Sequence, residues 1–246
     1  MPLTARRALR TFRYAVYFDG VDDYVANTAF SWSALQRGFT IALWLNPAVK
    51  TGDVLRHLSA PLGYFQIAYD SAPRRLYFAT RSTDTSELLA IGTSADSVRP
   101  NVFTNAALTW NTAVGCWYVN GALDVCVSDR RSGKGMGYTG YYIGRSLFWG
   151  WFSGYVAQVL IYSLILSNSE IQWNYQHPDN PIRNGLVLWL QADPAYIRDI
   201  NGDGVLEWID LSGFGNHGKI YGARLVQLTK TPARALEPAR VLPATR

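Results

Sequence analysis

Short segments in which apolar and polar residues alternate recur along most of this 246-residue chain, each followed by a turn signal. The clearest is Phe39–Leu45, which Asn46-Pro47 ends. Alternation with a period of two is typical of a strand with one buried face, and regularly spaced short strands favour a sandwich of antiparallel sheets over an α/β fold. The other predicted strands are Ala15–Val25, Tyr64–Tyr69, Leu76–Thr80, Ala106–Trp110, Cys116–Val119, Leu123–Cys126, Tyr141–Ile143 and Tyr155–Tyr162.

The two cysteines, Cys116 and Cys126, flank a predicted hairpin. Asn120-Gly121 between apolar segments is a strong hairpin signal. With a three-residue loop the cysteines face each other, and a cross-strand disulfide is expected. With a two-residue loop they fall on opposite faces, because side chains alternate along a strand. A disulfide would indicate an oxidising or extracellular setting, or a hyperthermophile.

A single short helix is predicted from Ser167 onward. Ser167 and Glu170 are spaced as a capping box, in which each side chain binds the backbone N–H of the other residue. The helix is expected to end before Pro178, since a proline cannot continue it.

Several of these segments, taken in order, carry a family pattern. They are Phe18–Val25, Phe39–Trp44, Ala107–Trp110 with Trp117–Gly121, Ile143–Arg145, Phe152–Val156 and Leu166–Ile171. In this order they resemble the laminin-G-like jelly rolls of the concanavalin A-like lectin/glucanase superfamily. The resemblance implies an all-β fold, a two-sheet antiparallel jelly-roll sandwich, over most of residues 15–177.

Residues 185–228 resemble the segment that normally precedes the opening strand of this family, yet here they come after everything else. About 44 residues are too few to form a sandwich alone, so their apolar strands need a host sheet. Either they complete their own jelly roll, as a circular permutation, or they pair with a neighbouring subunit. We favour the first arrangement, because the termini of a domain often lie close together.

These boundaries divide the chain into a jelly roll at residues 14–177, completing strands at 178–228, and two basic arms. Residues 1–13 hold four arginines and no acid, and residues 219–246 hold six basic residues and one acid. Regular prolines predict an extended arm over 229–246. Such arms either bind partners, in a homo-oligomer or on nucleic acid, or are solvated tails.

A calcium-loop pattern begins at Asp199. Oxygen-bearing side chains stand at positions 1, 3 and 5, a glycine at 6 and a carboxylate at 12. Without flanking amphipathic helices, the alternative is an acidic double turn. The ligand set predicted for Ca²⁺ is Asp199, Asn201, Asp203, the carbonyl of Val205, Glu207 and Asp210. A second acidic cluster, Asp19, Asp22 and Asp23, is interpreted as capping its own turn.

Aromatic residues gather between Phe148 and Phe152. Trp149 and Trp151, with Tyr141, are the candidate ligand-binding residues, because exposed rings stack on sugar faces or on another protein. The alternative is that most of these rings belong to the core.

Catalysis is not expected. The resemblance implies that a glucanase would carry a Glu-x-Asp-x-x-Glu strand, and none of the four glutamates falls in that pattern. The three histidines, His57, His177 and His217, show no metal-ligand spacing. No apolar run is long enough to cross a membrane, and residues 1–13 lack the apolar region of a secretory signal.

Two functions therefore remain. The first is a non-enzymatic structural subunit of an extracellular or virion assembly, a capsid, decoration or fibre protein held together by its arms. The alternative is an adhesion module that binds carbohydrate at a cell surface. Either function places the protein outside cells or on a virion surface.

Overall fold

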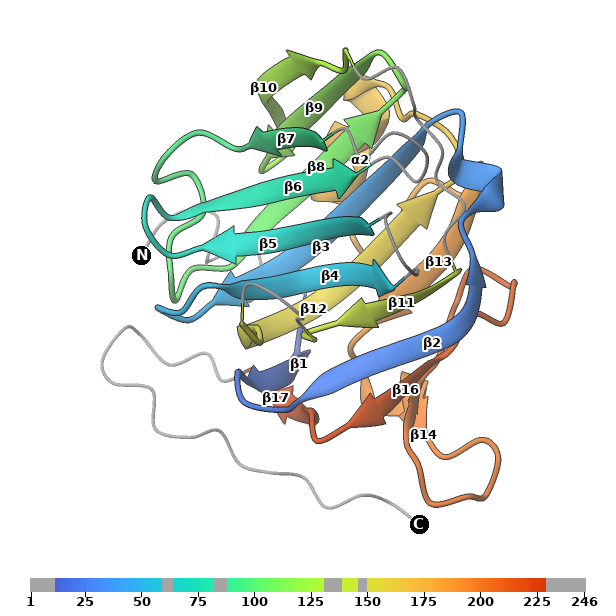
Figure 1. Cartoon of the computed structure of the whole chain (residues 1–246). Coiled ribbons are helices and arrows are strands. Elements are labelled where there is room, and N and C mark those ends of the chain that lie inside the picture. Colours follow the sequence, from blue (N-terminus) through green and yellow to red (C-terminus); the bar gives the residue numbers. More distant parts are fainter. Residues whose placement is uncertain (1–11, 59–63, 82–87, 131–138, 146–149, 229–246) are drawn as a thin grey trace.

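The protein is a sandwich of two antiparallel sheets in a computed structural model that describes residues 12–58, 64–81, 88–130, 139–145 and 150–228. The sheets lie face to face, and β4, β5 and β6 pass in front of β3 (Figure 1). All pairings between the named strands are antiparallel, which confirms the predicted fold class.

Sheet A, in the described part of the chain, has eight strands around the long central strand β12. In spatial order they are β10 (Ala122–Ser128), β9 (Val114–Val119), β8 (Thr104–Trp110), β3 (Phe39–Pro47), β12 (Ser153–Tyr162), β1 (Tyr14–Asp19) and β17 (Arg224–Gln227), and β13 (Leu186–Gln191) also pairs with β12.

Sheet B has nine strands among the described residues. In spatial order they are β14 (Ile197–Arg198), β15 (Glu207–Trp208), β16 (Gly218–Tyr221), β2 (Tyr24–Ser31), β11 (Thr139–Ile143), β4 (Gly52–Leu58), β5 (Tyr64–Asp70), β6 (Arg75–Arg81) and β7 (Leu88–Gly92). The predicted segment Ala15–Val25 is thus two strands, β1 in sheet A and the start of β2 in sheet B. The strands β4 and β7 were not predicted.

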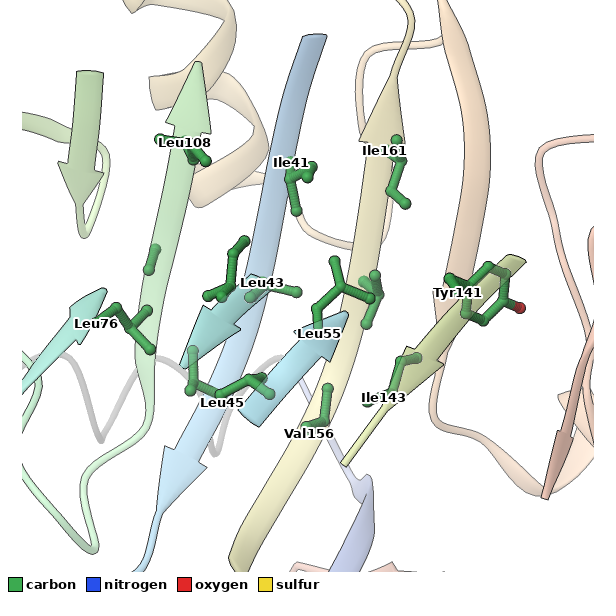
Figure 2. Close-up of a cluster of buried hydrophobic side chains, with 14 of the residues drawn as sticks. Ile41, Leu43, Leu45, Leu55, Leu76, Leu108, Tyr141, Ile143, Val156 and Ile161 are labelled. Carbon is green, nitrogen blue, oxygen red and sulfur yellow. The ribbon is translucent and has the colours of Figure 1, made fainter. Parts of the chain in front are cut away.

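The main core fills the space between the sheets. Ile41, Leu43 and Ile161 from sheet A meet Leu55 and Ile143 from sheet B (Figure 2). Since successive side chains of a strand point to opposite faces, each strand gives alternate residues to this layer. Four fully buried tryptophans enlarge it: Trp32, Trp110, Trp117 and Trp208.

Helix α2 (Asn168–Gln176) covers part of the outer face of sheet A, where Ile171 packs with Tyr118, Leu160 and Trp189. The predicted capping box is present, because Ser167 Oγ accepts from the Glu170 N–H and the Glu170 carboxylate accepts from the Ser167 N–H. The helix ends before Pro178, as predicted. None of the helices in the described ranges has the length and apolar character needed to span a membrane.

The C-terminal segment completes the sandwich of its own chain. β13 pairs with β12, β16 with β2, and β17 with β1. One edge of β12 is shared, because β1 pairs with Ser153–Val156 and β13 with Gln158–Tyr162. Within this single chain, these are the pairings of the arrangement in which the segment completes its own jelly roll. The short 3₁₀ helices Ser33–Leu35 and Pro194–Tyr196 lie in connections.

The hairpin of β9 and β10 has a two-residue loop, and Asn120 and Gly121 both adopt positive φ. A two-residue loop alone would put the cysteines on opposite faces. However, a bulge between Leu123 and Val125 shifts the register by one residue. Cys126 therefore lies opposite Cys116, and the two form a disulfide.

Candidate functional site

The outward face of sheet B carries a row of polar and aromatic side chains. Tyr142 on β11 lies opposite Arg56 on β4, which in turn lies opposite Gln66 on β5. The sequence neighbours of these residues, among them Leu55 and Ile67, belong to the core. By alternation the row itself points away from the core.

Four rings meet on this face and are called here the outer aromatic cluster: Tyr24, Tyr142, Trp151 and Tyr221. The ring of Tyr24 stacks on Tyr221 with centroids 4.6 Å apart and planes at 18°. It also contacts Trp151 at 6.0 Å and Tyr142 at 6.4 Å. All four rings are partly exposed. Half-exposed rings that already contact one another form a preorganised apolar platform at little cost in side-chain entropy.

A guanidinium lies against this cluster. The Cζ atom of Arg145 is 5.2 Å from the ring centroid of Tyr24 and 5.1 Å from that of Tyr142, so the cation is held by two π faces. Arg145 is half-buried and forms no ion pair with a described residue. Its charge therefore remains available to an anion.

A buried ion pair lies farther along the same face. Arg56 Nη1 donates to Asp53 Oδ2 at 3.3 Å, and both side chains are almost completely buried. The backbone of Asp53 also binds the segment before β12 that carries Trp151, through its N–H to the Gly150 carbonyl at 3.0 Å. A buried pair of this kind tolerates little movement, because separating two buried opposite charges is strongly unfavourable. The backbone hydrogen bond of Asp53 holds Gly150, the residue before Trp151, against β4.

The predicted ligand-binding residues have three different outcomes. Trp151 lies in the outer aromatic cluster. Trp149 lies outside the described residues. The prediction that Tyr141 offers an exposed ring to a ligand is corrected. Its ring is fully buried in the core, and its hydroxyl donates to the Asn216 carbonyl at 2.8 Å. Burial raises the pKa of Tyr141 well above its usual value. The next residue, Tyr142, has the outward position instead.

Sequence reasoning missed Tyr24, Tyr221 and Arg145. Tyr24 and Tyr221 each stand beside an inward residue, Val25 and Ile220, so alternation could have placed them on an outer face. Only the pairing of β16 with β2, between segments almost 200 residues apart, brings the two rings together.

The loop in which the sequence predicts calcium is ordered by hydrogen bonds to its own carboxylates. The carboxylate of Asp199 accepts from the N–H groups of Asn201, Gly202 and Gly204 at 2.7–3.2 Å. Asp203 accepts from the Val205 N–H at 2.9 Å and from Lys219 Nζ at 3.0 Å. These two bonds hold the pKa of Asp203 below its usual value.

Glu207 is the buried carboxylate of this region. Its side chain is 4 % exposed, and its Oε1 accepts from the amide of Asn201 at 2.8 Å. Its Oε2 is buried and has no hydrogen-bond partner among the residues that the structure describes. Glu207 lies opposite Lys219 in the pairing of β15 with β16.

Asp210 is not brought to this loop, which corrects its place in the predicted ligand set. Its Oδ1 accepts from the N–H groups of Trp189 and Ser212, both at 2.9 Å. Its Oδ2 accepts from Ser212 Oγ at 2.7 Å and from the Asn216 N–H at 2.9 Å. With four donors bound, this carboxylate fixes the turn that follows β15.

The second acidic cluster has the turn-capping bonds expected of it. Asp23 Oδ2 accepts from the Asp19 N–H at 2.9 Å, and Asp19 Oδ1 accepts from the Val21 N–H at 2.7 Å. Ligand atoms of Asp19, Asp22 and Asp23 lie within 4.8 Å of one another, the one such group of three found among the described residues. Burial raises the pKa of Asp23, and the neighbouring carboxylates add to this.

Residues 19–172 match the family model described as the concanavalin A-like lectin/glucanases superfamily. No curated protein matches the chain by sequence.

Solved structures share the fold at low sequence identity. A putative carbohydrate-binding protein from Bacteroides ovatus aligns with a TM-score of 0.63 at 18 % identity, over 89 % of this chain and 60 % of that one. The chain thus spans less than two thirds of the Bacteroides protein. A native heptameric SAP-like pentraxin from Limulus polyphemus aligns with a TM-score of 0.52 at 12 % identity, over 66 % and 82 %. The CBM40 of Ruminococcus gnavus IT-sialidase, bound to α2,3-sialyllactose, aligns with a TM-score of 0.51 at 14 % identity, over 65 % and 95 %.

Proposed function

Because the chain belongs to the concanavalin A-like lectin/glucanase superfamily, we propose that it is a non-enzymatic carbohydrate-binding module whose ligand binds at the outer aromatic cluster. The observation that carries this proposal is the contact of Tyr24 with Tyr142, Trp151 and Tyr221 on one face of sheet B. Sugar rings present apolar C–H faces that pack on such aromatic surfaces, and the adjacent polar groups orient them.

The charge on this face favours an acidic glycan. Arg145 is held against two rings of the cluster, where its guanidinium can form a bidentate pair with a sugar carboxylate or sulfate. Two of the solved structures with this fold are described as carbohydrate-binding, one of them in complex with a sialylated sugar. These neighbours support a glycan as the ligand class.

An oxidising location is part of the proposal. The Cys116–Cys126 disulfide lies in an exposed hairpin, where a reducing cytosol would act on it. Surface glycans are found outside cells, so the proposed ligand and the disulfide both favour an extracellular location.

The binding test compares single-ring variants of the full chain. A glycan array is expected to identify acidic ligands, and titration calorimetry with the best ligand measures affinity. Trp151→Ala and Tyr24→Ala should each weaken binding at least tenfold, or about 1.4 kcal/mol, since each removes part of the platform. Arg145→Gln should weaken binding to acidic sugars more than to their neutral analogues.

Trp173→Ala is the matched control. Trp173 is also a partly exposed tryptophan, but it lies on α2 and stacks on His177, away from sheet B. This variant should bind like the unmodified chain. An array without any binder would contradict the proposal, and so would equal affinity of the unmodified chain and all four variants.

The assembly function predicted from the sequence depends on the basic arms. Residues 1–11 and 229–246 lie outside the described residues, so a virion or capsid role stays a prediction. It predicts that the full chain forms an oligomer, and that a chain ending at Leu228 does so less. Light scattering after size exclusion measures both; two monomers would contradict this function.

A further inference from the structure

The acidic loop at residues 199–207 contains a carboxylate that the fold leaves incompletely paired. We propose that this loop binds one calcium ion through Asp199, Asn201, Asp203 and Glu207. This site is separate from the outer aromatic cluster, and the proposal does not depend on glycan binding.

The loop has the ligands and the backbone shape for a hard cation. Oxygen-bearing side chains alternate at positions 199, 201 and 203. Gly202 and Gly204 adopt positive φ values of 71° and 82°, which turn the backbone sharply between these ligands. Apart from its chain neighbours, no described residue lies within 4 Å of where a Cβ would stand on either glycine, so this part of the loop is open among the described residues. Calcium accepts such mixed carboxylate and amide oxygens in flexible geometry.

Glu207 is the observation that points to a ligand. It comes from β15 and not from the exposed loop, and its Oε1 already contacts the Asn201 side chain, so the carboxylate faces the loop. Its Oε2 is buried, and no described residue donates a hydrogen bond to it. A buried charged oxygen that loses its water and gains no partner is destabilising, so such groups are ordinarily paired or bound to metal. A cation beside Oε2 supplies the missing partner, and it requires the Asn201 amide, whose NH2 donates to Oε1 in this structure, to turn its oxygen towards the ion.

Lys219 competes with that cation. Its Nζ lies 3.0 Å from Asp203 Oδ2, and it stands opposite Glu207 on β16. The carboxylates of Asp199, Asp203 and Glu207 do not all come within 4.8 Å of one another while this pair is formed. Binding of the ion therefore requires Asp203 to release Lys219 and turn towards Glu207. The lysine sets the affinity, because calcium must displace it.

The test uses the full chain with Ca²⁺ followed by calorimetry and Tb³⁺ followed by luminescence. Trp208, next to Glu207 and fully buried, is positioned to sensitise terbium. One ion per chain is expected. Glu207→Gln should weaken binding at least tenfold, since it removes the buried charge. Lys219→Met should strengthen binding at least threefold, a gain that loss of a purely structural ion pair would not produce.

Two further variants keep the result decisive. Asp203→Asn changes an exposed residue, so it should weaken binding without preventing folding if Glu207→Gln does not fold. Asp22→Asn is the matched control in the other acidic cluster and should bind as tightly as the unmodified chain. Loss of binding in Asp22→Asn would assign the ion to Asp19, Asp22 and Asp23 instead. Absence of binding in both the unmodified chain and Lys219→Met would overturn the proposal.

Discussion

A chain that ends at Asn184 is expected not to fold. It loses the five strands β13 to β17, and with them the fully buried Leu188, Leu190 and Trp208. Burial of one large apolar side chain contributes about 1.5–3 kcal/mol, while a whole domain is stable by only about 5–15 kcal/mol. The truncation also exposes the edges of β12, β1 and β2 to solvent. Circular dichroism should show no cooperative thermal transition, and size exclusion should show aggregates.

The control for this truncation is a chain that ends at Leu228. This chain keeps all named strands. It also keeps the hydrogen bond from the Leu228 N–H to the Arg13 carbonyl at 2.8 Å. Its Tm should lie within a few degrees of that of the full chain. A cooperative transition at a similar temperature in the chain ending at Asn184 would show that residues 185–228 are dispensable for the sandwich.

Asp210→Ala is expected to be among the most destabilising single substitutions. It leaves the N–H groups of Trp189, Ser212 and Asn216 without their acceptor, and Asp210 is itself buried. Hydrogen bonds to a charged group contribute about 1.5–3 kcal/mol each, so a loss of about 3 kcal/mol or more is expected. For a domain of this size this lowers Tm by roughly 10 °C.

Thermal unfolding and urea titration measure this effect. Asp179→Ala, at an exposed aspartate, is the control and should change stability by less than about 0.5 kcal/mol. Asp210→Asn should fall between the two, because it keeps one acceptor oxygen but turns an amide N–H₂ towards existing donors. Equal stability of Asp210→Ala and the control would show that the bonds around Asp210 contribute nothing net.

Local sequence patterns predicted the elements whose signals are contained within one strand or helix. The alternation of Phe39–Leu45 gave β3, and the Ser167 and Glu170 capping box gave α2. β4 could not be found in this way, because a bulge between Asp53 and Leu55 puts two consecutive residues, Val54 and Leu55, into the core. The bulge breaks the period of two on which the prediction depends.

The candidate site was less accessible to sequence reasoning because register decides it. Tyr141 and Tyr142 are adjacent residues of the same type, so the sequence does not distinguish them, and only the pairing of β11 shows which ring points outward. In the same way, the bulge at Asp124 shifts the register of β10 by one residue, so Cys126 lies on the opposite face of the strand from the one that an unbroken register would give. Asp210 fits the twelfth position of a calcium loop, but its carboxylate instead accepts hydrogen bonds from the Ser212 and Asn216 N–H groups of the following turn.

The place of β1 in sheet A has a consequence for the timing of folding. β1 lies between β12 and β17, so the first strand of the sandwich needs a partner more than 200 residues away in the chain. During synthesis, β1 and β2 emerge early but keep open edges until the last strands leave the ribosome. Such distant pairings make folding slow. The sandwich therefore closes only after residue 227 has been synthesised, and until then the unpaired edges of β1 and β2 are sites at which the nascent chain can aggregate.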